Sequence, residues 1–195
     1  MELKKMDSYD VTDLRSLEKL EPVRVRPGMY IGSTGNKGLH HCIWEIIDNS
    51  IDEISNGFGD KVTITINEDK SITILDNGRG IPTGIHPTKK KSGVEMVFTE
   101  LHTGGKFDNK NYKTSGGLHG VGAAVVNALS KFLEVEVYQN GKVYRQRFEY
   151  AYDKELKRDM PGTPVTDLEI VGKSIKTGTK VTFKPDNEIF STTDF

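Results

Sequence analysis

The sequence predicts an α+β domain, a two-layer sandwich in which a mixed, largely antiparallel β-sheet carries helices on one face. Two observations lead to this class. Helical patterns come mainly early in the chain and paired strand patterns come later, and strands and helices do not alternate regularly. With 195 residues there is enough chain for one domain with a proper core. We expect an N-terminal arm over residues 1–12 and one domain over residues 13–195.

The composition is that of a globular domain without a strong charge. Hydrophobic residues make up 35% of the chain, and 27 basic residues nearly balance 28 acidic ones, so no bulk attraction to nucleic acid or to a membrane is indicated. Cys42 is the single cysteine, which excludes an internal disulfide. No apolar stretch has the length of a signal peptide or of a membrane span. We therefore expect a cytoplasmic protein with no membrane partner.

The first third of the chain predicts two helices. A short helix is expected over residues 13–20, followed by a loop that begins at Pro22 and includes RVRPGMYIGS. Residues 39–56 form the clearest helical pattern, because apolar residues recur there at helical spacing. These are Leu39, Ile43, Ile46, Ile47, Ile51 and Ile54. Gly57 is placed to end this helix as a C-cap.

The middle of the chain predicts a hairpin, a helix and a long loop. Residues 62–66 and 71–74 alternate with period two around a polar turn, which is typical of a hairpin with one buried face. A helix is expected over residues 93–101. A loop over 102–118 then leads to a helix that ends near Phe132, and a loop of that length in a compact domain is usually functional or disordered.

The last third predicts further strands. Residues 134–138 and 142–150 flank Asn140–Gly141, the strongest short hairpin signal. Residues 152–164 are polar and typical of a loop. Strands are expected over 165–171 and 179–183, and Pro185 ends the last one.

The long helix has a polar side that is open to two interpretations. At 100° per residue, the side opposite the isoleucines carries Glu45, Asp48, Asn49 and Asp52. A solvated face is the ordinary explanation of such a pattern. However, no lysine or arginine lies on that side to neutralise the carboxylates, and Glu45 and Asn49 are neighbours at i and i+4. A carboxylate beside an amide oxygen suits Mg²⁺ that keeps several of its waters.

Two glycine-containing segments are candidate ligand sites. DNGRG at residues 76–80 follows a strand and is either a plain turn or a strand-end carboxylate that accepts from a ligand amine while the glycines allow close approach. KTSGGLHGVG at residues 113–122 is either a mobile connection or a phosphate cradle before a helix. Its spacing fits neither the dinucleotide fingerprint nor the P-loop.

These motifs occur together in an order that resembles a known ATP-binding fold. The order is E-x-x-x-N on a helix, D-x-G-x-G, a long loop with GGLHGVG, and T-G-T before a strand. The fold is shared by gyrase, the ninety-kilodalton heat-shock chaperone, sensor histidine kinases and MutL. RPGMYIG, EIIDNSIDE, DNGRGIPTGIH and GGKFDNKNYKTSGGLHGVG are similar, over nearly the whole chain, to the ATP-binding N-terminal domain of a bacterial type IIA DNA topoisomerase B subunit. Topoisomerase IV and gyrase are the two candidates.

The resemblance implies a role for each matching position. Glu45 would be the general base that activates water, Asn49 would hold Mg²⁺, Asp76 would accept from the adenine amino group, and Thr179 would support Asp76 and its water. Gly80 would let the purine approach. The base pocket and its rim would be formed by Ile46, Glu53, Arg79, Ile81, Pro82 and Val97. The lid over the phosphates would be formed by Lys106, Tyr112, Gly117, Leu118, His119, Gly120, Val121 and Gly122, and Tyr9 would reach the nucleotide of a second subunit.

The implied function is ATP binding and hydrolysis that gates dimerisation for DNA strand passage, in decatenation or supercoiling. ATP and Mg²⁺ are the implied cofactors. The implied partners are a second copy of the chain, an A-type topoisomerase subunit and DNA, the last two through other domains. Such a domain would be an antibiotic target.

Some features depart from the family pattern or leave alternatives. The family uses a lysine in a Q-T-K motif, which is not present here, so we expect a fragment that turns ATP over slowly. Gln139–Asn140 stands where many relatives carry an arginine that contacts coumarin drugs. IGSTGNKGLHH and TGTKVTFKPDNEIF favour topoisomerase IV of Gram-positive bacteria. A MutL-type ATPase and a non-catalytic nucleotide-dependent dimerisation module are the alternatives, while Glu45 argues against a histidine kinase.

Overall fold

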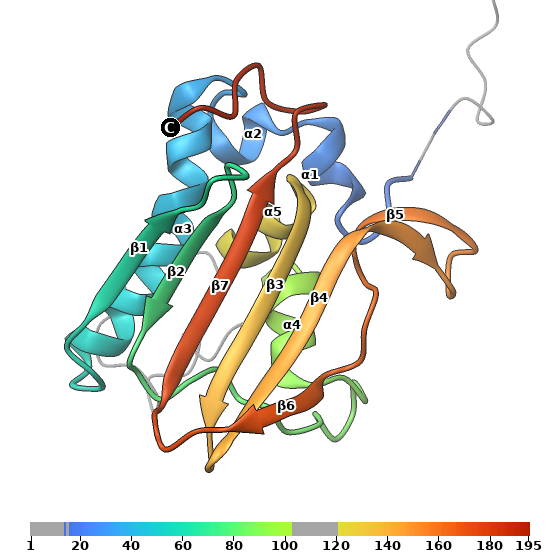
Figure 1. Cartoon of the computed structure of the whole chain (residues 1–195). Coiled ribbons are helices and arrows are strands. Elements are labelled where there is room, and N and C mark those ends of the chain that lie inside the picture. Colours follow the sequence, from blue (N-terminus) through green and yellow to red (C-terminus); the bar gives the residue numbers. More distant parts are fainter. Residues whose placement is uncertain (1–13, 15, 103–120) are drawn as a thin grey trace, which may run out of the picture.

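Helices cover one face of a seven-stranded sheet in this computed structural model, which describes residues 14, 16–102 and 121–195 (Figure 1). The helices are α1 (Glu21–Val25), α2 (Gly28–Ile31), α3 (Asn36–Ser55), α4 (Gly93–Thr99) and α5 (Gly122–Ala128). The strands are β1 (Val62–Ile66), β2 (Ile72–Asp76), β3 (Ser130–Gln139), β4 (Lys142–Asp153), β5 (Arg158–Pro164), β6 (Glu169–Lys173) and β7 (Gly178–Pro185). The predicted α+β class is confirmed.

The sheet has the strand order β1-β2-β7-β3-β4-β5, and β6 also pairs with β4. Every pairing between these strands is antiparallel. β4 divides its outer edge, with residues 142–145 paired to β6 and residues 148–153 paired to β5. The last strand, β7, lies in the middle of the sheet between β2 and β3. It therefore connects the β1–β2 hairpin to the strands β3, β4 and β5.

The hydrophobic core lies between the helices and the sheet. Leu39 and Ile46 of α3 are buried, as are Leu133 of β3 and Phe183 of β7. Phe98 of α4 packs against Phe148 of β4 with ring centroids 5.8 Å apart. Alternation along β7 places Val181 and Phe183 on the helix side, as period-two patterning requires.

Several predicted elements are confirmed. The long helix, the 62–66 and 71–74 strands and the hairpin at Asn140–Gly141 are all present. Asn140 has φ 54° and Gly141 has φ 76°, which is the backbone that a tight two-residue hairpin turn needs. Gly57 has φ 87° and its N–H donates to the carbonyl of Ile54, so it ends α3 as expected.

Other predictions were wrong at the N-terminal end. In the described part of residues 13–20 no helix forms, and α1 begins at Glu21 instead. Pro22 lies in the first turn of this helix, where a residue needs no amide hydrogen for an intrahelical bond. The expected loop RVRPGMYIGS contains the end of α1 and the whole of α2.

Three more boundaries differ toward the C-terminal end. The helix expected to end near Phe132 stops at Ala128, and β3 begins at Ser130. Residues 158–164, expected to be a loop, form β5; Pro161 and Gly162 hid this strand, and an outer strand tolerates proline. The strand expected over 165–171 is displaced to β6 at Glu169–Lys173.

The helical wheel of α3 was only partly right. Its buried line includes Cys42, Ile46 and Ser50, each four residues from the next, whereas Ile51 is 45% exposed. Asp52, expected on the polar side, is buried at 3% exposure. Within the described ranges, no helix is both long and apolar enough to cross a bilayer.

Phe183→Ala should destabilise the fold by about 3–5 kcal/mol, because it removes a fully buried ring from the central strand and leaves a cavity. Ile175→Ala is the matched control, since Ile175 is completely exposed. Urea unfolding followed by circular dichroism measures both. A loss below about 1 kcal/mol for Phe183→Ala would show that the core does not depend on this ring.

Candidate functional site

The candidate site is built around Asp76, the last residue of β2, where that strand meets the start of β7 and the face of α3. Ser50 of α3 donates its hydroxyl to Asp76 Oδ2 at 3.0 Å. The backbone N–H groups of Gly78 and Thr179 donate to Asp76 Oδ1 at 2.9 and 3.1 Å. One carboxylate therefore joins a helix, a turn and a strand.

The electrostatics of Asp76 are set mainly by burial. The residue is 7% exposed, and removal from water raises the pKa of its carboxyl above the ordinary 3.8. The hydrogen bonds from Gly78, Ser50 and Thr179 act in the opposite direction but do not cancel this effect. A buried carboxylate that still accepts hydrogen bonds is suited to recognising a donor on a ligand.

Glycines allow the backbone to pass close to Asp76. A Cβ on Gly178 would lie 2.1 Å from the carbonyl oxygen of Asp76, and its φ of 140° is outside the range that other residues prefer. A Cβ on Gly80 would lie 2.9 Å from Val137. These two positions need glycine because neighbouring parts of the protein fill the space of a side chain; the predicted approach of a ligand to the DNGRG glycines stays a prediction.

The predicted base-pocket residues come from α3, from the loop after Asp76 and from α4. Thr179 Oγ1 accepts from the N–H of Ile81 at 3.3 Å, so the strand that supports Asp76 also holds the next loop. Ile46 is buried in the core, and Ile81 and Val97 are partly buried against it. Pro82 is exposed, and its carbonyl lies against the first residue of α4, the helix that carries Val97.

At the predicted rim of the base pocket, Glu53 and Arg79 form an ion pair, and Arg79 stacks on the ring of Phe58. Glu53 of α3 accepts from Arg79 at three donors, the backbone N–H at 3.0 Å, Nε at 3.0 Å and a terminal nitrogen at 2.8 Å. The Arg79 guanidinium lies 3.7 Å from the centre of the Phe58 ring. Gln139, at the β3–β4 hairpin tip, donates to the Arg79 carbonyl at 3.3 Å and so connects the tip to the rim.

Glu45 and Asn49 lie one turn apart on α3. The Asn49 side-chain N–H donates to the Glu45 carbonyl at 3.0 Å, which fixes the orientation of the amide. Glu45 Oε1 lies 3.0 Å from Nε2 of His41. His41 was not among the predicted site residues, although a histidine four residues before the proposed base lies on the same face of a helix.

Two of the predicted phosphate-lid residues lie within the described part of the chain. Val121 and Gly122 are described at the start of α5. Those that lie outside the described residues are Tyr9, Lys106, Tyr112, Gly117, Leu118, His119 and Gly120.

The donor set near Glu45 fits a cation that arrives with phosphates. Among the described residues, no group of three or more His, Cys, Asp or Glu side chains would hold a metal by itself. Asn49 offers one amide oxygen, and Mg²⁺ commonly takes one or two protein ligands and completes its shell with water and substrate phosphates.

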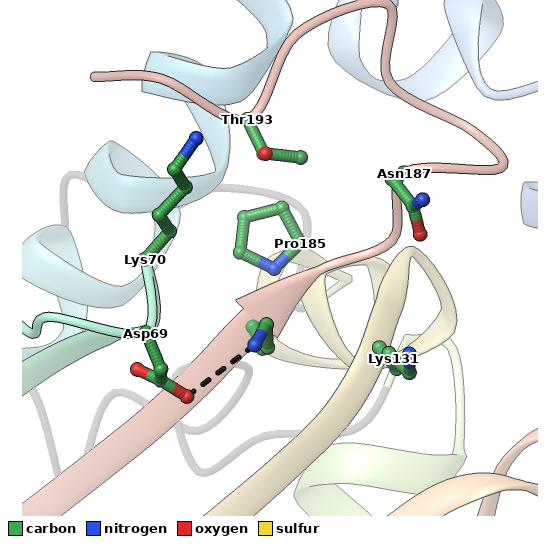
Figure 2. Close-up of a pocket in the computed structure, with 7 residues that line it drawn as sticks. Asp69, Lys70, Lys131, Pro185, Asn187 and Thr193 are labelled. Carbon is green, nitrogen blue, oxygen red and sulfur yellow. Dashed lines mark hydrogen bonds and ion pairs between the residues drawn. The ribbon is translucent and has the colours of Figure 1, made fainter.

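A separate cavity of about 250 Å³ lies at the opposite end of the same strands (Figure 2). Its wall carries Asp69, Lys70, Lys131, Lys184, Pro185, Asn187 and Thr193. Lys184 pairs with Asp69 at 3.5 Å, and Lys70 pairs with Asp194 at 2.5 Å. Because two of its three lysines already face carboxylates, this cavity is a weaker candidate than the Asp76 site.

Comparison with known proteins assigns the class. The family of histidine kinase-, DNA gyrase B- and HSP90-like ATPases matches residues 34–189. The chain belongs to this family.

Particular relatives come from two kinds of enzyme. The chain is 56% identical to the B subunit of DNA topoisomerase 4 from Staphylococcus epidermidis over 194 residues, 99% of this chain and 28% of the relative. It is 53% identical to the B subunit of DNA gyrase from Thermotoga maritima over 190 residues, 97% of this chain and 28% of the relative. The chain thus spans just over a quarter of the length of these curated relatives.

A solved structure supports the fold. The chain is similar to the crystal structure of the 43K ATPase domain of Thermus thermophilus gyrase B in complex with an aminocoumarin, with a TM-score of 0.72 and 43% sequence identity. The match covers 88% of this chain and 40% of that one.

We expect the Asp76 carboxyl to titrate above pH 3.8 in the folded protein, because burial disfavours its charged form. The folded state then holds this proton more tightly than the unfolded state does. The stabilising contribution of the group is fully present below pH 3.8 and is lost as pH rises through the folded pKa. Carbon-13 NMR of the aspartate carboxyl groups measures the midpoint.

Asp69 is the internal control for this titration. Hydrogen bonds from the hydroxyl and backbone N–H of Ser71 lower the pKa of Asp69. An Asp76 midpoint at or below that of Asp69 would contradict the burial argument.

Proposed function

We propose that this chain is the ATP-binding and ATP-hydrolysing domain of a bacterial type II DNA topoisomerase. The observation that carries the proposal is the buried Asp76 carboxylate, which is held by β7, by its own turn and by α3, the helix that also carries Glu45 and Asn49. Family membership and the two kinds of relative support it.

Adenine recognition is the first proposed step. Asp76 accepts a hydrogen bond from the exocyclic amine of the base, and the glycine at position 80 lets the loop after Asp76 pack close to Val137 of β3. Ile46, Ile81 and Val97 supply apolar surface, and the Glu53–Arg79 pair closes the rim. The Asp76 carboxylate is buried. A base without a donor at this position would leave that carboxylate without the hydrogen bond from the amine, and water could not replace it.

Hydrolysis is the second proposed step. Glu45 takes a proton from a water molecule, the water oxygen bonds to the γ-phosphorus, and the bond from that phosphorus to the β–γ bridging oxygen breaks, which gives ADP and phosphate. His41, at 3.0 Å from Glu45 Oε1, positions the carboxylate. Asn49 would hold Mg²⁺, which neutralises charge on the phosphates when it is bound.

The wider role follows from the relatives and belongs to the proposal. ATP binding would promote pairing with a second copy of the chain, and hydrolysis would accompany DNA strand passage together with an A-type subunit and DNA. The relatives at 53–56% identity include both topoisomerase IV and gyrase proteins, so decatenation and supercoiling both stay open.

Asp76→Asn should weaken binding of a non-hydrolysable ATP analogue by roughly 1–3 kcal/mol, because it replaces an acceptor by a group that also carries donors beside two backbone N–H groups. Isothermal titration calorimetry with Mg²⁺ present measures this. Asp159→Asn is the matched control, since Asp159 is exposed on β5. Equal affinities for Asp76→Asn and the unmodified chain would remove adenine recognition from Asp76.

Glu45→Gln should leave analogue affinity nearly unchanged and lower turnover in the complete subunit roughly 10²–10⁴-fold, because it removes a proton acceptor and keeps the shape. Phosphate release measured alongside calorimetry separates the two effects. Glu68→Gln, at an exposed position, is the control. Turnover that survives Glu45→Gln would assign the base to another residue and favour a different mechanism at the same pocket.

A further inference from the structure

Gly122, the first residue of α5, packs directly against the side chain of Glu45. A Cβ built on Gly122 would lie 1.9 Å from Glu45 Oε2 and 2.8 Å from the carboxyl carbon. Both distances are shorter than real Cβ contacts. The space that a side chain at position 122 would occupy is therefore filled by the Glu45 carboxylate.

Backbone conformation does not explain the glycine. Gly122 has no positive φ and lies in a helix, where alanine is favoured over glycine. Conformational freedom, the usual reason for glycine, is thus not needed at this position. An alanine does not fit here because its methyl group would overlap the carboxylate of Glu45.

The two oxygens of Glu45 have different neighbours. Oε1 lies 3.0 Å from His41 Nε2, on the same helix, and Oε2 lies against the backbone at position 122, on another helix. The His41 ring lies at ion-pair distance from one oxygen, and close packing limits the other. The orientation of the carboxylate is consequently set by α3 and α5 together.

We propose that Gly122 is a positioning residue for Glu45: its missing side chain admits the carboxylate to the place from which it acts on water. This rests on the proposed function for the role of Glu45, and it assigns to Gly122 a role that is separate from any contact with phosphate. A methyl group at position 122 displaces the flexible end of Glu45 and leaves the backbone of α5 in place.

The first experiment compares Gly122→Ala with Gly28→Ala. Gly28 is also the first residue of a helix, α2, and a Cβ there would meet nothing within 4 Å. In the complete subunit, Gly122→Ala should lower the turnover number by roughly 10²-fold, at the low end of what a general base contributes, with the affinity for a non-hydrolysable ATP analogue changed less than about threefold. Gly28→Ala should leave both unchanged. Normal turnover in Gly122→Ala would overturn the proposal.

The second experiment tests the contact itself by thermal unfolding, in a background where Glu45 is replaced by alanine. Gly122→Ala should lower the melting temperature when Glu45 is present and should lower it much less in the Glu45→Ala background, because the carboxylate is then gone and only the Cβ of residue 45, at 3.1 Å, stays close to the methyl group. Equal losses in the two backgrounds would show that position 122 needs glycine for a reason other than Glu45 and would overturn the proposal.

These readouts separate this inference from the proposed function. A complete subunit that does not hydrolyse ATP at all would refute the proposed function, whereas the melting-temperature comparison would still decide whether Gly122 and Glu45 compete for the same space. Both the inference about Gly122 and the proposed function are supported if the melting-temperature effect of Gly122→Ala depends on Glu45 and if this variant loses turnover but retains binding.

Discussion

The site depends on one buried carboxylate. Asp76 receives hydrogen bonds from α3, from the turn after β2 and from the first residues of β7, so its ionised form is stabilised only when all three have their native arrangement. Burying such a group without partners costs several kcal/mol. Asp76 therefore links the geometry of the pocket to the integrity of the fold.

A second polar connection extends from the same loop. Glu53 of α3 binds both the backbone and the side chain of Arg79, and Phe58, just after the helix, stacks on the same guanidinium. The helix thus holds the DNGRG loop at two places, by Ser50 through Asp76 and by Glu53 through Arg79. Because both contacts come from one rigid helix, the loop between them has few ways to move independently.

Several elements of the fold and of the site could be predicted from the sequence, because their signals lie within short segments of the chain. Strong periodicity identified the long helix, and the Asn140–Gly141 pair identified a hairpin whose turn needs positive φ at both residues. Asp76 and its glycines stood out as a carboxylate between a strand and two glycines, a local pattern that also fits a plain turn, and their role came from the resemblance to the ATP-binding family. These signals are local, so they survive without knowledge of the fold.

The missed features depend on partners far away in the chain. β5 contains Pro161 and Gly162 and is a strand only because β4 pairs with it. Pro22 lies in the first turn of α1, where local rules predicted the start of a loop. Asp52 was placed on the wrong side of α3, because burial depends on which elements cover a helix. The contact between Gly122 and Glu45 joins two helices, and nothing in either segment alone indicates it.

The position of β7 has a consequence for how the chain acquires its site. This strand is the last in sequence but lies between β2 and β3, and Thr179 reaches Asp76 across 103 positions of the chain. Such long-range contacts form late, since the entropy of closing a large loop must be overcome before they contribute. During synthesis, the earlier segments emerge with an incomplete sheet and a carboxylate that lacks one of its donors. Competence to recognise a ligand should then arise in a single late step, when the central strand inserts.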